Sequence, residues 1–142
     1  MPPTASNIKL RILVVDDERD ILLGLNALLR WHNHYVKIFD NSLEALRHIT
    51  GNNGTTTSYD LVITDYRMPG GISGLDLAKW VKERTGRKLK VFLMTSFDES
   101  SIPGLSEALE SKIIDELVQK PIPNDKLISI IEKSFLQHNN NH

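Results

Sequence analysis

Along nearly its whole length, the sequence alternates between short apolar runs and segments of helical periodicity. The apolar runs are rich in β-branched residues and predict buried strands at 10–15, 35–39, 59–64, 89–94 and 113–118. Helical periodicity predicts helices at 18–31, around 45–49, at 75–84, weakly within 101–112 and around 127–135. This alternation predicts βα units with right-handed crossovers. We therefore expect an α/β fold, a doubly wound five-stranded parallel sheet with five helices.

Two local features refine this prediction. Asp40 or Asn41 is expected to cap the second helix. Asp115 and Glu116 make the fifth strand polar, which is typical of an edge strand.

The length of 142 residues suits a single domain. We expect an N-terminal tail at 1–7, one folded domain at 8–136 and a C-terminal tail at 137–142. Residues 51–58 are polar and contain glycine, so they predict a surface loop.

Composition excludes several classes of function. With no cysteine, the chain has neither disulfides nor thiolate metal sites. Its 17 basic and 18 acidic residues lack the basic excess of a nucleic-acid binder, so we expect no direct contact with nucleic acid. No apolar run is long enough to span a bilayer and the N-terminus lacks a signal-peptide core, so we expect a cytoplasmic protein without membrane insertion.

Polar residues collect where the expected strands end. Since ligands of open parallel sheets bind beyond the carboxyl ends of the strands, these residues are the candidate site. They are Asp16, Asp17 and Glu18 after the first strand, Asp65 after the third, Thr95 and Ser96 after the fourth, and Lys120 after the fifth.

Each of these residues alone has an ordinary structural role. Acids and hydroxyls before a helix are usually caps, Asp65 alone is more often a turn residue, and a lone lysine is usually solvated. Their combination on one rim favours a hard cation such as Mg²⁺, because only oxygen ligands are offered. An added hydroxyl and ammonium suit the stabilisation of a phosphoryl group in transfer.

Four motifs carry a family resemblance: ILVVDDE (12–18), YDLVITDYRMPG (59–70), FLMTS (92–96) and LVQKPI (117–122). In this order the chain resembles the receiver domains of two-component response regulators over about residues 8–136. The resemblance implies a flavodoxin-like strand order, 2-1-3-4-5.

The resemblance also implies a role for each site residue. Asp65 is expected to be the phosphoacceptor, Thr95 the hydroxyl that follows the phosphoryl group, and Lys120 its cationic partner, before a cis bond to Pro121. The implied Mg²⁺ ligands are Asp16 (through water), Asp17, Asp65 and the backbone carbonyl of Arg67.

On this interpretation the chain is a stand-alone response regulator. It accepts a phosphoryl group from a sensor histidine kinase or phosphotransfer protein and signals by protein contacts or phosphorelay to an unknown downstream protein. It is not an enzyme beyond its own phosphorylation and dephosphorylation. The alternative is a receiver-like binding module whose output is independent of phosphorylation.

Departures from the family pattern favour that alternative. Leu117 stands where receivers usually carry Phe or Tyr, and Lys112, Ile113 and Ile114 stand near the usual Gly-Ala. The segment between Thr95 and Lys120 is a few residues longer than is usual in receivers, and Pro103 and Gly104 within it are expected to delay or break its helix. The loop between Met68 and Gly74 is one residue longer than the usual receiver loop.

Two other classes fit less well. A phosphohydrolase of the haloacid dehalogenase type needs a second Asp two residues after the first, where this chain has Arg67. A flavin carrier needs a phosphate-binding loop after the first strand, where this chain has acids.

Overall fold

The structure is a computed structural model, and it describes residues 8–51, 58–68, 72–86, 88–96 and 98–140. The expected tail 1–7, most of the loop at 51–58 and the long loop after Met68 lie wholly or largely outside these residues. The elements are β1 (Arg11–Val15), α1 (Arg19–Trp31), β2 (Tyr35–Phe39), α2 (Ser42–Thr50), β3 (Leu61–Asp65), α3 (Gly74–Thr85), β4 (Lys90–Thr95), the 3₁₀ turn η1 (Glu99–Ser101), α4 (Leu105–Glu110), β5 (Glu116–Gln119) and α5 (Asn124–Asn140).

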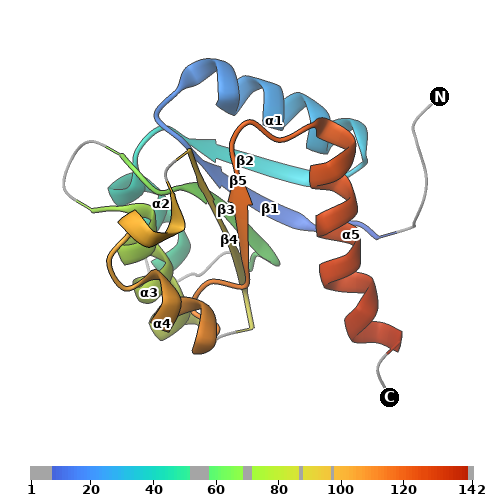
Figure 1. Cartoon of the computed structure of the whole chain (residues 1–142). Helices are drawn as coiled ribbons and strands as arrows, with labels where there is room; N and C mark the ends of the chain where they lie inside the picture. Colours follow the sequence, from blue (N-terminus) through green and yellow to red (C-terminus); the bar gives the residue numbers. More distant parts are fainter. Residues whose placement is uncertain (1–7, 52–57, 69–71, 87, 97, 141–142) are drawn as a thin grey trace.

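The strands form one parallel sheet, and the predicted fold class is confirmed. The strand order is β2-β1-β3-β4-β5, with all pairs parallel. Helices α1 and α5 cover one face of the sheet, and α2, α3 and α4 cover the other (Figure 1). This arrangement brings the carboxyl ends of the neighbouring strands β1 and β3 side by side, near the middle of the end of the sheet where all the strands finish.

Each face of the sheet buries its own apolar core. On the α1–α5 face the fully buried side chains include Ile12, Leu29, Phe92, Leu127 and Ile131. On the other face they include Leu13, Val62, Leu77, Leu93 and Ile114. Because adjacent strand residues point to opposite faces, β1, β3 and β4 need near-continuous apolar runs, which their sequences supply.

Side-chain caps fix where two helices begin. The side chain of Asn41, not that of Asp40, caps α2 by accepting a hydrogen bond from the Glu44 amide at 2.8 Å. Helix α3 begins with a capping box, in which the Ser73 hydroxyl accepts from the Asp76 amide at 3.1 Å and the Asp76 carboxylate accepts from the Ser73 amide. As a result Gly74, the first residue of α3, lies next to Asp65 at the end of β3.

The fifth strand begins later than the sequence indicates. Lys112 has a left-handed φ of 64°, and the amides of Ile113 and Ile114 both donate to the Ala108 carbonyl. The apolar pair is therefore a turn at the end of α4, although Ile114 is fully buried. The predicted edge position of this strand is confirmed, since β4 is the one strand among the described residues that pairs with β5.

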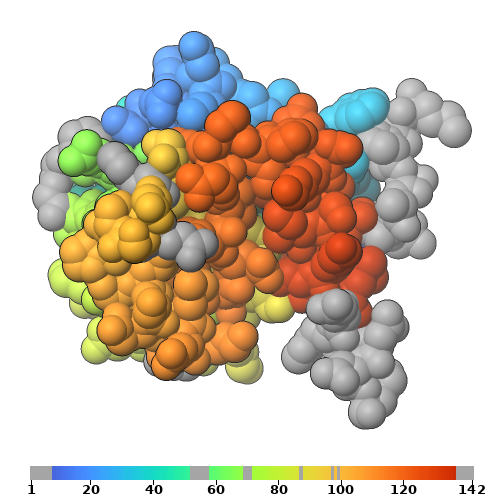
Figure 2. Space-filling model, viewed as in Figure 1, coloured from blue at the N-terminus to red at the C-terminus, as the bar shows by residue number. Residues whose placement is uncertain are grey.

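The region after β4 is irregular, as Pro103 and Gly104 predict. It forms η1 and then only the six residues of α4, and Figure 2 shows it, in yellow and orange, spread over the molecular surface. Helix α5 continues to Asn140, beyond the predicted end of the domain at 136. Across the described residues, no helix has the length and apolar character needed to cross a membrane.

Candidate functional site

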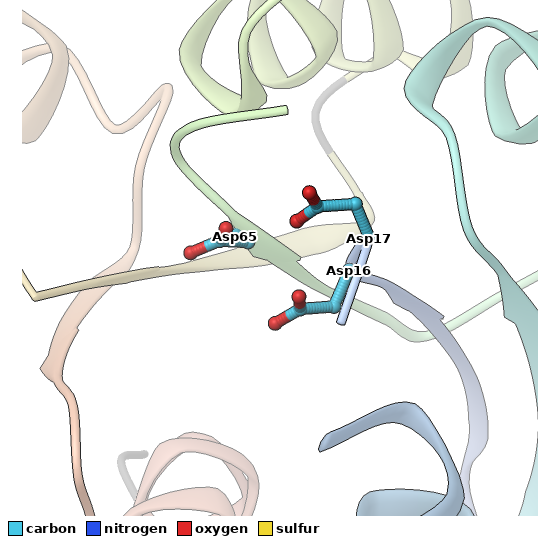
Figure 3. Close-up of side chains that lie close together, drawn as sticks. All are labelled: Asp16, Asp17 and Asp65. Carbon is cyan, nitrogen blue, oxygen red and sulfur yellow. The ribbon is translucent and has the colours of Figure 1, made fainter. Parts of the chain in front are cut away.

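Three carboxylates converge at the carboxyl ends of β1 and β3. Asp16 and Asp17 follow β1, Asp65 ends β3, and Figure 3 shows the three side chains grouped together. One oxygen from each lies within 4.8 Å of the others. The predicted meeting of these three acids is thus present in the structure.

Lys120, the residue after β5, lies against these carboxylates. Its Nζ lies 2.9 Å from Asp16 Oδ2 and 3.0 Å from Asp65 Oδ1. The Lys120 amide donates to the Thr95 carbonyl at 2.9 Å, so β4 fixes the main chain from which the side chain departs. The bond from Lys120 to Pro121 is cis, as expected.

The three carboxylates differ in burial. Asp16 is fully buried, Asp65 is 7% exposed and Asp17 is exposed. Asp16 is also oriented, because its Oδ1 accepts a hydrogen bond from the Glu18 amide at 2.9 Å while its Oδ2 faces Lys120. The site therefore has a fixed floor, formed by Asp16, and an open rim.

Burial and charge shift the pKa of both partners in the central ion pair. Burial raises the pKa of Asp65, repulsion from Asp16 and Asp17 adds to the rise, and the contact with Lys120 opposes it. For Lys120, burial favours the neutral amine, but hydrogen bonds and attraction from Asp16 and Asp65 outweigh it and raise the pKa. The acids thus carry mutual repulsion that a divalent cation would relieve.

Asp17, Asp65 and Lys120 line a pocket of about 520 Å³, and the buried Asp16 lies outside its lining. Arg67, whose backbone carbonyl is a predicted Mg²⁺ ligand, also lines this pocket, with Glu18, Met68 and Ser96. The sequence placed Glu18 and Ser96 at the candidate site without a specific role, and it did not point to Met68. The signal for Glu18 was its position directly after the acid pair, and its Oε1 lies 3.6 Å from Lys120 Nζ.

Thr95 occupies a different position from the other candidates. It ends β4, is 1% exposed and pairs in register with Gln119 of β5. Among the described residues, Ser96 rather than Thr95 lines the pocket. Thr95 therefore lies beneath the rim of the pocket. It directly follows Met94, the residue of β4 that pairs in register with Asp65.

This donor set fits a hard divalent cation. It offers carboxylate oxygens without thiolate or imidazole, the ligands that Mg²⁺ prefers, and one side of the pocket is open to further ligands. An ammonium group already placed against Asp65 can stabilise negative charge that develops on a ligand there.

The sequence matches a known protein family. A profile of the response regulator receiver domain family matches residues 12–132. The chain belongs to the receiver-domain family of response regulators. It is 30% identical to two-component response regulator ARR5 of Arabidopsis thaliana over 92% of this chain, and 35% identical to transcriptional regulatory protein ZraR of Klebsiella oxytoca over 82%. It spans 77% of ARR5 but only 24% of ZraR.

Solved structures agree. The response regulator TrrA of Thermotoga maritima, in complex with Mg²⁺ and a beryllium fluoride, is 35% identical with a TM-score of 0.68, covering 87% of this chain and 96% of that one. A receiver domain from Clostridium thermocellum is 29% identical with a TM-score of 0.73, covering 93% of this chain and 98% of that one. Receiver domains are phosphoacceptor signalling domains of two-component systems, and they interact with histidine kinases or phosphotransfer proteins.

Proposed function

We propose that this receiver takes a phosphoryl group onto Asp65 in a Mg²⁺-dependent reaction. The donor is a sensor histidine kinase or a phosphotransfer protein. Output passes through protein contacts with a downstream protein or through phosphorelay. The observation that carries this proposal is the position of Lys120 Nζ, 2.9 Å from Asp16 and 3.0 Å from Asp65, beside three carboxylates within 4.8 Å of one another.

Each residue has a role in the transfer. Asp65 Oδ attacks the phosphorus of a phosphohistidine, the P–N bond breaks, and its electron pair returns to the imidazole ring. Lys120 offsets the charge gained by Asp65, about one to two negative charges. The Thr95 hydroxyl donates a hydrogen bond to the transferred group, and the movement of Thr95 draws the chain after β4 toward the pocket.

Asp16, Asp17, Asp65 and the Arg67 carbonyl would hold the metal ion. Asp16 acts largely through water, which suits its contact with Lys120, since Mg²⁺ usually retains several waters. A bound ion would supply positive charge that offsets the acids and attracts phosphate oxygens.

Labelling with acetyl phosphate tests the proposal. Wild-type protein in Mg²⁺ should gain one acid-stable, base-labile phosphoryl group, and Asp65→Asn should gain none. Asp60→Asn is the matched control, because Asp60 flanks the other end of β3, is exposed, and retains an oxygen for the Arg11 amide. Stoichiometric labelling of the Asp65→Asn protein refutes the assignment.

A phosphorylation-independent binding module is the second candidate, favoured by Leu117. This side chain is partly buried in the core on the α4 face and is not aromatic. A pull-down of partner proteins with and without beryllofluoride separates the two functions. Equal capture in both conditions supports the binding module.

A further inference from the structure

The main-chain carbonyl of the proposed phosphoacceptor lies directly against the first residue of α3. A Cβ placed on Gly74 would lie 2.1 Å from the carbonyl oxygen of Asp65, 2.9 Å from its carbonyl carbon and 3.0 Å from Leu93 Cδ1. Non-bonded heavy atoms attract one another at about 3.5–4.0 Å and repel strongly well inside that range. No side chain fits at position 74 without movement of the main chain.

Backbone conformation does not account for this glycine. Gly51, Gly86 and Gly104 have left-handed φ angles of 73°, 77° and 80°, whereas the φ of Gly74 lies outside that range. In a helix, alanine has a higher propensity than glycine. What position 74 requires is space for the Asp65 carbonyl.

Hydrogen bonds hold the same stretch of main chain from several directions. The Thr64 hydroxyl donates to the Asp65 carbonyl at 3.0 Å. The Tyr66 amide donates to the Met94 carbonyl at 2.8 Å, and the Gly74 amide donates to the Tyr66 carbonyl at 2.8 Å. The two peptides on either side of Tyr66 are therefore tied to β4 and to α3, so the main chain here has little freedom to rotate away from an added methyl group.

We propose that Gly74 and Thr64 are positioning residues for phosphoryl transfer, which act by holding the Asp65 carbonyl and so aiming its carboxylate at Lys120. This inference rests on the proposed function. Neither residue touches the phosphoryl group. With a Cβ at 74, either α3 or the Asp65 main chain must move by about 1 Å to bring the contact to about 3 Å, and a misplacement of that size slows a reaction by about 100-fold.

Gly74→Ala tests this directly, with Gly24→Ala as the matched control. Gly24 lies in α1, where a Cβ would meet nothing within 4 Å, so Gly24→Ala should raise the thermal midpoint and label with acetyl phosphate at the wild-type rate. Gly74→Ala, assayed below its midpoint in saturating Mg²⁺, should show a maximal labelling rate about 100-fold lower. Its Mg²⁺ dissociation constant, measured by calorimetry, should rise.

A purely structural role gives a different result. Gly74→Ala would then have a lower thermal midpoint, yet the folded protein would label at the wild-type maximal rate with an unchanged Mg²⁺ dissociation constant, and the proposal would be overturned. If Gly74→Ala does not fold, Thr64→Val decides. It removes one hydrogen bond to the same carbonyl oxygen, and its labelling should slow about fivefold. A wild-type rate there overturns the proposal.

These outcomes are distinct from failure of the proposed function. Absence of labelling in wild-type protein, or labelling that persists in Asp65→Asn, refutes the proposed function whatever Gly74→Ala does. Labelling of the wild type that is lost in Asp65→Asn and unchanged in folded Gly74→Ala refutes only the positioning role.

Discussion

The acidic pocket and the neighbouring α4 segment, residues 98–115, are held in place in different ways. The pocket stands on β1 and β3, each hydrogen-bonded to strands on both sides, and on Lys120, whose amide extends the pairing of β5 with β4. The α4 helix has six residues and no side-chain cap, and glycine and lysine residues with left-handed φ precede and follow it. Strand pairing in the sheet thus fixes the positions of the pocket residues, whereas a few local contacts fix the position of the α4 segment.

Two groups of contacts anchor the α4 segment. Ile102, Leu105 and Ala108 pack into the core, and a buried ion pair fixes the far end. There, Asp115 Oδ2 accepts from Lys82 Nζ at 2.7 Å and from the Val91 amide at 2.8 Å. A charge change at the pocket should therefore move residues between Thr95 and this ion pair more than it moves the strands.

Removing the buried ion pair should have the largest effect on folding. Lys82 is 3% exposed, so Lys82→Ala leaves a poorly solvated carboxylate and should lower the free energy of unfolding by about 3–5 kcal/mol in urea titrations. Arg47→Ala removes an exposed pair with Glu44 and should change it by less than about 1 kcal/mol. Folded Lys82→Ala should still label with acetyl phosphate. Loss of labelling would show that the two regions are not separable.

Asp17→Ala should affect the pocket alone. Loss of an exposed ligand should weaken Mg²⁺ binding by about 100-fold in calorimetric titrations and leave the urea midpoint of the metal-free protein nearly unchanged. Asp20→Ala, also exposed but in the first turn of α1, serves as the control. Unchanged affinity in Asp17→Ala would remove this residue from the proposed ligand set.

Gly104→Ala should weaken the α4 segment by a smaller amount. A Cβ there has room, with its nearest neighbour Leu75 Cδ2 at 3.9 Å, but the left-handed φ of 80° is unfavourable for alanine by about 1–2 kcal/mol. Urea titrations should show this loss, and the Mg²⁺ affinity should stay the same. A stability equal to that of the wild type would mean that local conformation does not limit this segment.

Asp65→Asn should produce the smallest shift in stability, and one that depends on pH. Folding raises the pKa of this carboxyl above its usual 3.8, so its ionisation weakens the folded state. The penalty is absent below 3.8 and grows as the pH rises through the folded pKa. In metal-free buffer, the thermal midpoint of Asp65→Asn relative to wild type should therefore rise from acid to neutral pH. A constant difference contradicts the raised pKa.

The sequence predicted most of the fold because its apolar runs and helical segments alternate without interruption. It also predicted the pocket, since strand ends of a parallel sheet share one edge, so that Asp16, Asp65 and Lys120 meet although they lie far apart in the chain. The limits of β5 were missed because Ile113 and Ile114 are apolar yet form a turn. Only packing in three dimensions reveals this.

Other features depend on contacts that no local pattern encodes. The ion pair of Lys82 with Asp115 joins residues 33 positions apart, on α3 and before β5. The closeness of Gly74 to the Asp65 carbonyl depends on how α3 packs against β3. Both contacts follow from tertiary packing, so a single sequence cannot predict them.

A crystal structure with Mg²⁺ and beryllofluoride tests the central claim most directly. We expect beryllium bonded to an Asp65 oxygen, a metal ion held by Asp17, Asp65 and the Arg67 carbonyl, and Lys120 Nζ against a fluorine. Full occupancy at another carboxylate, or an ion site that excludes Asp65, would contradict it.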